Sequence, residues 1–449
     1  MKIGHVRASA VWTLAAIAAL ASPVAAQSWC TPQRASNGFV ALTGVTVWDG
    51  TGTAARPGMT ILVHGERIVA VGPAGRVSVP AGAAVRDLSG AFVIPGLFES
   101  HGHVGSDVSG EDTRERAGRR LCRALLGGIT VVRDMAGDTR ALASMARDAK
   151  VGDIASPDIY FAALWAGPSF FSDPRTAQAS AGEVPGSLPG MRAVDSTTDL
   201  RQAVAEARGT GATAIKLYAD LPAPLVAAAT AEAHRQGLLV WAHAAIGPVT
   251  PLQVVDAGVD VVSHAPLVAR QLGLEQYRAL TRDSVAVPPG TFDTPGFDSL
   301  MDAMRRRQTI FDPTLFIYGA VRGSLVPVAA AVTVRAHRAG IPLVAGTDSL
   351  GVGDAGPWVL PNLHRELWLL VHLGGLTPAE ALGAATRNAA MATGSLRDRG
   401  TIEPGKLADL LILDADPTAD IENTGKIRLV LKRGAFYPGG PTIGDATAP

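Results

Sequence analysis

Short apolar runs alternate with longer amphipathic stretches through the middle of the chain, from residue 96 to residue 395. Runs of this kind predict buried strands, and the longer stretches predict helices. We expect strands in the apolar run at residues 92–97, which ends close to His101, and at residues 129–132, 159–162, 212–217, 238–242, 259–262, 309–311 and 341–345. About eight strand–helix units over roughly 300 residues predict an α/β fold, a (β/α)8 TIM-like barrel.

Both ends of the chain show a different pattern, in which short β-branched runs are separated by glycine-containing turns. The runs lie at residues 41–48, 60–63 and 67–71 before the barrel, and at residues 408–413 and 427–431 after it. Such runs predict antiparallel strands, and a sheet of this kind needs a partner for its apolar face. We therefore expect residues 27–95 and 396–449 to form one small β-sandwich domain from both termini.

The first 26 residues have the pattern of a secretory signal peptide. Lys2 and Arg7 precede an apolar run over residues 8–21, and small residues follow at 24–26. The apolar run is too short to cross a bilayer, so we expect cleavage and a secreted or periplasmic protein without a membrane anchor. An uncleaved anchor is the alternative.

Net charge restricts the class of partner. The 449-residue chain has 40 basic and 40 acidic side chains, and loss of Lys2 and Arg7 with the signal peptide leaves a net charge of −2. A nearly neutral protein has no electrostatic attraction to nucleic acid or to anionic membranes. We therefore expect a small-molecule substrate as the partner, and the composition leaves homo-oligomerisation open.

The chain has two cysteines, Cys30 and Cys122. In an oxidising compartment this pair can form a disulfide that ties the N-terminal tail to an early helix of the main domain, and two unpaired thiols are the alternative. Two cysteines cannot build a zinc–thiolate site. Any metal must therefore be held by histidine, aspartate, glutamate or lysine.

Reactive side chains recur at the carboxyl ends of the predicted strands, where a barrel collects its active-site residues. His101 and His103 are two residues apart in an extended segment, so both imidazoles can point the same way. Further strands end at Lys216, His243, His264 and Asp348. A buried histidine or a loop-capping aspartate would explain any one of these positions, but hardly all of them together.

Long turn-rich loops follow the third, sixth and eighth predicted strands, at residues 166–194, 287–298 and 351–361. They and their borders carry the aromatic residues Trp165, Phe170, Phe171, Phe292, Phe297 and Trp358. A partly apolar substrate pocket is one interpretation, and aromatic rings that pack on one another are the other.

With these motifs the sequence resembles the amidohydrolase superfamily of metal-dependent hydrolases. It is most similar to the Xaa-Pro-dipeptidase-like and imidazolonepropionase-like group. The motifs are PGLFESHGH at 95–103, IKLY at 215–218, His243, His264, GTD at 346–348 and GTIEPGKLADL at 400–410. The resemblance implies a distorted (β/α)8 barrel with an attached β-sandwich, and an enzyme that cleaves the amide or peptide C–N bond of a dipeptide or an N-acyl amino acid.

The resemblance also implies two divalent metal ions, usually zinc. His101, His103 and Asp348 would bind the first ion, and His243 and His264 the second. Lys216 would bridge both ions after N6-carboxylation, because a free ammonium has no acceptor atom. A metal-activated hydroxide would attack the substrate, with Asp348 as general base and acid.

Other features of the sequence depart from the relatives or leave alternatives open. Some relatives have a loop rich in glycine and histidine after the third strand, where this chain has GPSFF at 167–171, and no two-residue anchor for a substrate carboxylate is evident. Tyr218 is a candidate substrate contact, or a ring packed under the loops. We predict structural roles for the histidines at positions 64, 234, 337, 364 and 372. The alternative functions are a lactonase or phosphotriesterase on the same metal site, and a non-catalytic periplasmic binding protein.

Overall fold

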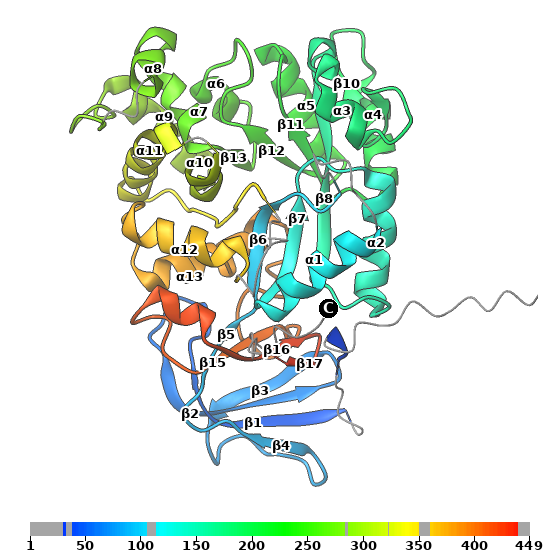
Figure 1. Ribbon diagram of the computed structural model, residues 1–449, viewed down its shortest axis with the longest axis vertical. Helices are drawn as coiled ribbons and strands as arrows, with labels where there is room; N and C mark the ends of the chain where they lie inside the picture. Colours follow the sequence, from blue (N-terminus) through cyan, green and yellow to red (C-terminus); the bar gives the residue numbers. More distant parts are fainter. Residues whose placement is uncertain are drawn as a thin grey trace, which may run out of the picture.

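The computed structural model describes residues 30–32, 38–105, 114–282, 286–321, 323–349 and 360–438 (Figure 1). The predicted signal peptide and Trp358 lie outside these residues. Within the described ranges, no helix combines the length and the apolar character that a bilayer crossing requires. The chain forms a barrel of parallel strands surrounded by helices, with a separate sheet packed below it.

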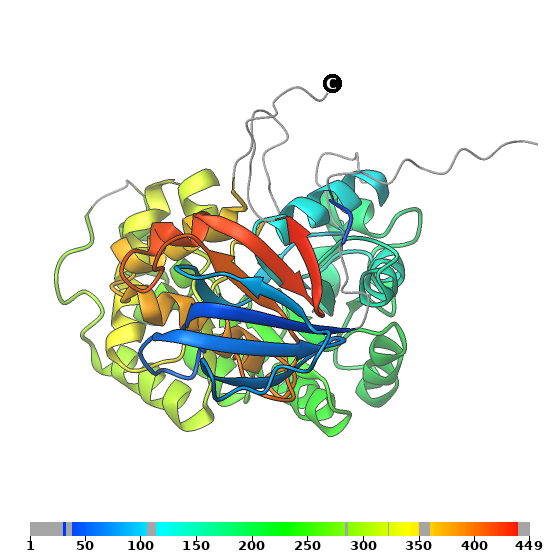
Figure 2. The same cartoon turned by 90° about the horizontal axis from the view of Figure 1, so that it is seen from below.

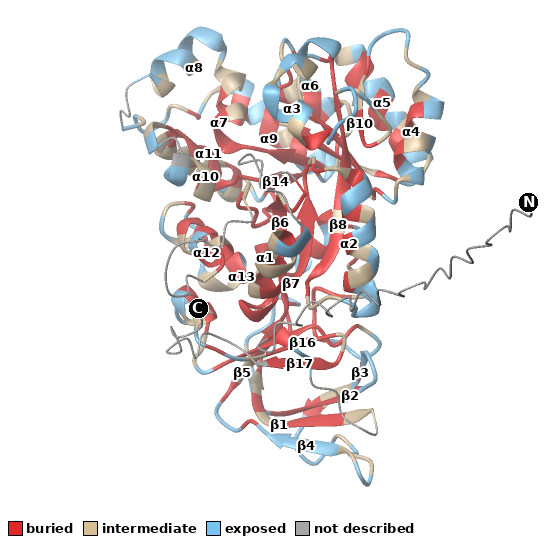
Figure 3. Ribbon diagram, turned by 45° about the vertical axis from the view of Figure 1, so that its right-hand side comes forward, coloured by how far each residue is buried: buried red, intermediate tan, exposed pale blue. Residues whose placement is uncertain are grey.

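The barrel is built from parallel strands that follow the chain order. They are β6 (Leu97–Gly102), β7 (Ile129–Asp134), β8 (Asp158–Ala166), β11 (Ala214–Leu217), β12 (Leu239–His243), β13 (Val261–Ser263) and β14 (Ile310–Asp312). Most of their residues are buried (Figure 3), as expected for strands covered on both faces. The prediction of an α/β barrel is confirmed.

The predicted eighth strand, residues 341–345, is the least regular part of the barrel. It makes a single parallel bridge, between Phe311 and Leu343, instead of a continuous ladder. Pro342 has no N–H to donate, which limits regular pairing on this segment. A backbone hydrogen bond from the Ser100 N–H to the Ala345 carbonyl nevertheless connects it to β6, so the barrel is nearly closed.

The apolar run before His101 divides between the two units. Phe92–Pro95 is β5, which belongs to the lower sheet, and the first barrel strand, β6, begins only at Leu97. Gly96 joins them, and a Cβ there would collide with the Thr130 side chain. The expectation of one strand ending before His101 was wrong in this respect, because the chain passes from one sheet to the other within the run.

The lower sheet combines both ends of the chain (Figure 2). Its other strands are β1 (Phe39–Val47), β2 (Arg56–His64), β3 (Arg67–Pro73), β4 (Ala84–Asp87), β15 (Leu410–Leu413), β16 (Ile427–Lys432) and β17 (Ala435–Pro438). Antiparallel pairing of β5 with β15 joins the N-terminal strands to the C-terminal ones, as the sequence predicts. The apolar faces of these strands pack into a core of their own.

Helices cover the barrel between its strands. They are α1 (Arg114–Leu126), α2 (Thr139–Val151), α3 (Pro174–Ala179), α4 (Leu200–Gly209), α5 (Ala223–Arg235), α6 (Pro251–Asp256), α7 (Ala265–Val268), α8 (Leu274–Thr281), α9 (Pro295–Arg307), α10 (Leu315–Val321), α11 (Val326–Arg338), α12 (Asn362–His372), α13 (Pro378–Ala384) and α14 (Arg387–Ala392). Short 3₁₀ segments, Pro168–Ser172, Ala269–Leu272, Gly323–Leu325 and Ile421–Gly425, and two short strands, β9 (Ser187–Leu188) and β10 (Met191–Ala193), complete the loops. Side chains cap two of these helices: Asp199 accepts from the Gln202 N–H at the start of α4, and Thr377 forms a capping box with Glu380 at the start of α13.

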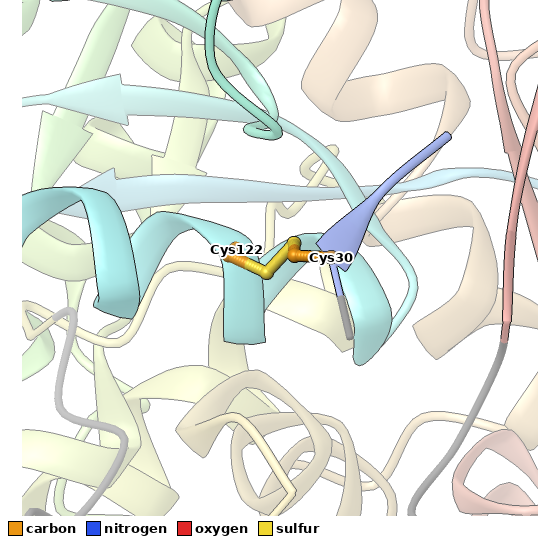
Figure 4. The surroundings of a disulfide bond; sticks show 2 residues. All are labelled: Cys30 and Cys122. Carbon is orange, nitrogen blue, oxygen red and sulfur yellow. A yellow bond between two sulfur atoms is a disulfide. The ribbon is translucent and has the colours of Figure 1, made fainter. Parts of the chain in front are cut away.

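The two cysteines form a disulfide (Figure 4). Cys30 and Cys122 lie 92 positions apart in the sequence, and their Cα atoms are 6.3 Å apart. The bond ties the segment around Cys30 to α1, and both residues belong to the outer core of the barrel. The sequence left open a disulfide or two unpaired thiols, and the structure has the disulfide.

Candidate active site

The six reactive residues predicted from the sequence gather at one end of the barrel. His101 lies near the end of β6, Lys216 near the end of β11, and His243 at the end of β12. His103 follows β6 and His264 follows β13. Asp348 follows the eighth strand position.

His101, His103 and Asp348 form what we call the first group, and the Asp348 carboxylate lies at its centre. Its Oδ1 is 2.8 Å from His103 Nε2 and 3.2 Å from His101 Nε2. Within the described residues, the donor atoms of His101, His103 and Asp348 all lie within 4.8 Å of one another. Two imidazole nitrogens and a carboxylate oxygen at this separation can bind one divalent cation.

His243, His264 and Lys216 form what we call the second group, which lies beside the first. The His264 ring is 4.7 Å from the His243 ring and 5.1 Å from the His101 ring, measured between centroids. His264 Nδ1 is also 4.0 Å from Asp348 Oδ2, so this carboxylate faces both groups. Lys216 is fully buried, and its Nζ donates to Ser263 Oγ at 3.0 Å.

Burial sets the charge state of the second group. Desolvation, together with the positive neighbours of each ring, holds the pKa values of His243 and His264 well below 6.5. Both rings are therefore neutral, which is the form that binds metals. Burial also lowers the pKa of Lys216 to about 8, although Asp312 and Asp348 oppose this shift.

In the first group, neighbouring charges outweigh burial in setting the pKa values. Burial alone would lower the pKa of His101, but Asp348 and Asp312 raise it to about 9. Conversely, burial would raise the pKa of Asp348, but His101, His103 and His264 hold it well below 3.8. The two carboxylates thus stabilise a positive charge at His101, and a metal ion on its Nε2 would supply the same charge.

Two of these residues have strained backbones. Asp348 has φ +57° and His264 has φ +78°, conformations that L-amino acids adopt at a cost. Backbone bonds hold both in place, because Asp348 N–H donates to the His101 carbonyl at 2.8 Å and His264 N–H donates to the Asp312 carbonyl at 2.9 Å. Strain of this kind concentrates at functional sites.

Two buried carboxylates beneath His101 were missed by sequence reasoning. Asp312 ends β14, and its Oδ2 is 2.6 Å from His101 Nδ1. Glu99 accepts hydrogen bonds from the His101 and Thr347 backbones and from the Thr347 hydroxyl. Asp312 could have been found, because it follows an apolar strand run just as Asp348 does.

Tyr218, Phe170 and Phe171 line one side of the site, and we call them the aromatic wall. The Tyr218 ring centroid is 3.9 Å from that of His243 and 4.7 Å from that of Phe170. Phe171 contacts Phe170 edge-on at 5.5 Å. These rings place an apolar surface next to the second group.

The other predicted aromatic residues do not join this wall. Phe292 and Phe297 are buried against each other, and Trp165 is buried in the outer core. The remaining described histidines have partners elsewhere: His64 stacks on Phe39, His234 pairs with Asp260, His337 with Glu380, His364 with Thr424, and His372 stacks on Trp368.

Comparison with known proteins agrees with this arrangement. A model of the amidohydrolase family matches residues 92–436. The ochratoxinase of Aspergillus niger is 27% identical over 410 residues, covering 80% of this chain and 78% of that protein. The imidazolonepropionase of Caulobacter vibrioides is 27% identical over 381 residues, covering 80% and 88%.

Solved structures show the same fold. A Xaa-Pro dipeptidase with methionine in its active site has a TM-score of 0.70 at 21% identity, covering 89% of this chain and 100% of that one. The ochratoxinase of A. niger has a TM-score of 0.68 at 21% identity, covering 92% and 99%. Because the family match spans the chain from β5 through the barrel and on to the C-terminal strands, the chain belongs to the amidohydrolase family of C–N bond hydrolases.

Proposed function

We propose that this chain is a secreted, binuclear metal-dependent amidohydrolase that cleaves the amide bond of a dipeptide or an N-acyl amino acid. One observation carries the proposal. The Asp348 carboxylate faces imidazoles of both groups, His101 and His103 on one side and His264 on the other. A single carboxylate in this position could bind a metal ion and also accept a proton from a reacting water.

The donor set fits two divalent ions. His101, His103 and Asp348 would hold one ion, and His243 and His264 the other. Imidazole and carboxylate donors favour zinc. The bound ions would lower the pKa of a water ligand and polarise the substrate carbonyl.

Lys216 would bridge the two ions as a carbamate. Carboxylation requires the neutral amine, and a pKa near 8 leaves a usable fraction of that form at neutral pH. The reaction with carbon dioxide would form an N–C bond, release one proton and replace a buried cation with an anion. The histidines around Lys216 are neutral or metal-bound in this scheme. The carbamate would therefore supply negative charge to the two cations.

Asp348 would carry the proton in the reaction. It is ionised at neutral pH, because the neighbouring histidines hold its pKa low. It can therefore accept a proton from the attacking water and pass it to the leaving nitrogen. The aromatic wall would cover the substrate and limit access of bulk water.

Secretion rests on two features. Disulfides persist in oxidising compartments, and the Cys30–Cys122 bridge is of that kind. The signal-peptide pattern at residues 1–26 indicates the same route. N-terminal sequencing of exported protein would locate the cleavage; retention of the protein in the cytoplasm with residues 1–26 attached would contradict this part.

Similarity to proteins named ochratoxinase, imidazolonepropionase and Xaa-Pro dipeptidase supports an amide substrate. The test is metal analysis of the purified enzyme together with a panel of N-acyl amino acids, dipeptides, lactones and phosphotriesters. We expect about two ions per chain, amide hydrolysis, and loss of activity on chelation that added zinc restores. Full activity of metal-free protein would overturn the metal assignment. Preference for lactones or phosphotriesters, or ligand binding without turnover, would favour the alternative functions.

A further inference from the structure

Both groups of the site receive a hydrogen bond from one short segment, residues 312–314, at the end of β14 and before α10. Asp312 Oδ2 is 2.6 Å from His101 Nδ1, in the first group. Thr314 Oγ1 is 3.0 Å from His264 Nδ1, in the second group. In each ring the hydrogen bond lies on Nδ1, which leaves Nε2 for a metal ion and sets the tautomer. The segment therefore orients one histidine of each group.

The backbone of this segment is strained at Thr314. Its φ is +52°, which is a genuine outlier for a β-branched residue. Asp312 and Thr314 are both fully buried, and the carbonyl between them, that of Pro313, accepts from the Ala265 N–H at 3.1 Å. A strained conformation of this kind persists only where the surrounding structure holds it. The groups that hold residues 312–314 therefore bear on the geometry of both histidines.

Glu366 holds the chain directly after Thr314. It lies in α12, it is fully buried, and it accepts from the backbone N–H groups of Leu315 at 3.1 Å and Phe316 at 2.6 Å. These are the first two residues of α10, whose N–H groups have no partner within the helix. Each N–H uses a different oxygen of the carboxyl group. Glu366 therefore joins α12 to the segment that carries Asp312 and Thr314.

A helix cap alone does not explain a buried acid at this position. The helices α6 and α13 are capped from their own chain by Thr250 and Thr377, with side chains that stay near the surface. Burying a carboxyl group away from water is costly, and the cost is met only where its hydrogen bonds matter. The position of the two N–H groups, next to the strained Thr314, gives Glu366 a role beyond capping.

We propose that Glu366 is a positioning residue for both metal ions, acting through Asp312 on His101 and through Thr314 on His264. The inference rests on the proposed function and adds to it a residue whose hydrogen bonds go to the backbone of α10 instead of to the histidines. Loss of a partner that orients a metal-binding histidine typically weakens metal binding by about tenfold to a hundredfold. Loss of Asp312 or Thr314 should weaken one ion each, whereas loss of Glu366 should weaken both.

The test is competition with a chromogenic chelator, which measures the affinity of the purified enzyme for each of its two zinc ions. Glu366→Gln keeps the size of the side chain but has one acceptor oxygen, so an amide N–H faces one of the two backbone N–H groups. It should weaken both ions by about tenfold to a hundredfold. Asp312→Asn and Thr314→Val should each weaken a different ion. Thr314→Ser keeps the hydroxyl and should bind both ions nearly as the wild type does.

A combined variant shows whether Glu366 acts through the segment. Added to an enzyme that already carries Asp312→Asn and Thr314→Val, Glu366→Gln should weaken the ions clearly less than it does alone, because residues that act as one unit are not additive. A full additional loss would show that Glu366 acts by another route. Glu380→Gln is the control, because Glu380 also accepts from a backbone N–H at the start of a helix, α13, and should leave both affinities unchanged.

Thermal melting of the zinc-free enzymes identifies the variants that fold. Glu366→Asp, which keeps both oxygens on a shorter side chain, repeats the test if Glu366→Gln does not fold. Unchanged affinity for both ions in a folded Glu366 variant, a loss confined to one ion, or failure of both variants to fold would overturn the inference and leave the metal site standing. If the wild type binds fewer than two zinc ions, the binuclear proposal fails, and this inference fails with it.

Discussion

Both ends of the barrel bury charged side chains, but they balance the charges differently. At the lower end, Asp158 begins β8 and is met by three cations, Arg399, Lys432 and Arg433, each at 2.7 Å. Asp409 pairs with Arg399 at 3.2 Å. Burial alone would raise the pKa of Asp158, but Lys432 and Arg399 hold it well below 3.8. This network joins the barrel to the lower sheet.

At the mouth, Asp348 and Asp312 face the imidazole of His101, and the groups beside them are held in their neutral form or close to it by burial. Lys216 has a hydroxyl as its hydrogen-bond partner, and its pKa falls because burial disfavours its charge. His243 and His264 are neutral for the same reason. The comparison teaches that a buried carboxylate surrounded by fixed arginine and lysine cations is structural. Buried carboxylates set among imidazoles that can be neutral are instead suited to binding an external cation.

Asp348→Asn should have the largest effect at the mouth. The amide cannot accept the proton of the attacking water, so kcat should fall by about a hundredfold to ten-thousandfold. The midpoint of thermal unfolding should stay close to that of the wild type, because the substitution removes the charge and keeps the shape. The measurement is steady-state hydrolysis at saturating zinc. An Asp348→Asn enzyme with normal kcat would show that another group handles the proton.

Asp158→Asn should have the largest effect at the lower end, and on stability instead of activity. It leaves the buried Arg399 and Lys432 and the half-buried Arg433 without their shared carboxylate. Breaking a buried ion pair in this way typically costs about 3–5 kcal/mol. Urea unfolding measures the loss, and kcat of the folded fraction should not change. Asp153→Asn is the control, because Asp153 pairs with Arg147 at the surface, where an ion pair contributes about 1 kcal/mol or less. Equal losses for the two variants would mean that the Asp158 network is not structural.

The Asp158 contribution should also depend on pH in a defined direction. Its pKa is lower in the folded state than in the unfolded chain, where it is near 3.8. The stabilisation is therefore complete above that value and is lost as the pH falls below it. The difference in unfolding free energy between the wild type and Asp158→Asn should be constant from pH 7 to about pH 5 and shrink below about pH 4. A difference that persists undiminished at low pH would contradict the ion-pair explanation.

The mouth was largely predictable from the sequence, and the lower end was not. Lys216, His243 and Asp348 each end an apolar run, and the rule that barrels collect reactive residues at strand ends brought them together correctly. The partners of Asp158 lie far along the chain, with Arg399 separated by 241 positions and Arg433 by 275. No local pattern connects such positions, since their pairing depends on how the two units dock.

Other limits of the prediction have local causes. The run at 92–97 looked like one strand because apolar periodicity does not reveal to which sheet a residue belongs. Phe170 lay in a loop whose path no periodicity fixes, so the packing of its ring against Tyr218 could not be foreseen. Asp312 also follows an apolar run, as Asp348 does, but its contact with His101, 211 positions away in the sequence, is visible only in the structure.

Asp312→Asn should have the smallest of these effects, and it sharpens the contrast between the two ends. Asparagine can still accept from His101 Nδ1, so the ring should keep its orientation, but the negative charge that strengthens the ligand is lost. Loss of such a partner typically weakens metal binding by about tenfold to a hundredfold. Competition with a chromogenic chelator measures this affinity, and saturating zinc should restore most of the activity. Asp260→Asn is the matched control, because Asp260 pairs with His234 at 2.8 Å away from the site and should leave zinc affinity unchanged. If Asp312→Asn reduces stability as strongly as Asp158→Asn and leaves zinc affinity intact, the carboxylate beneath His101 belongs with the structural charges of the lower end.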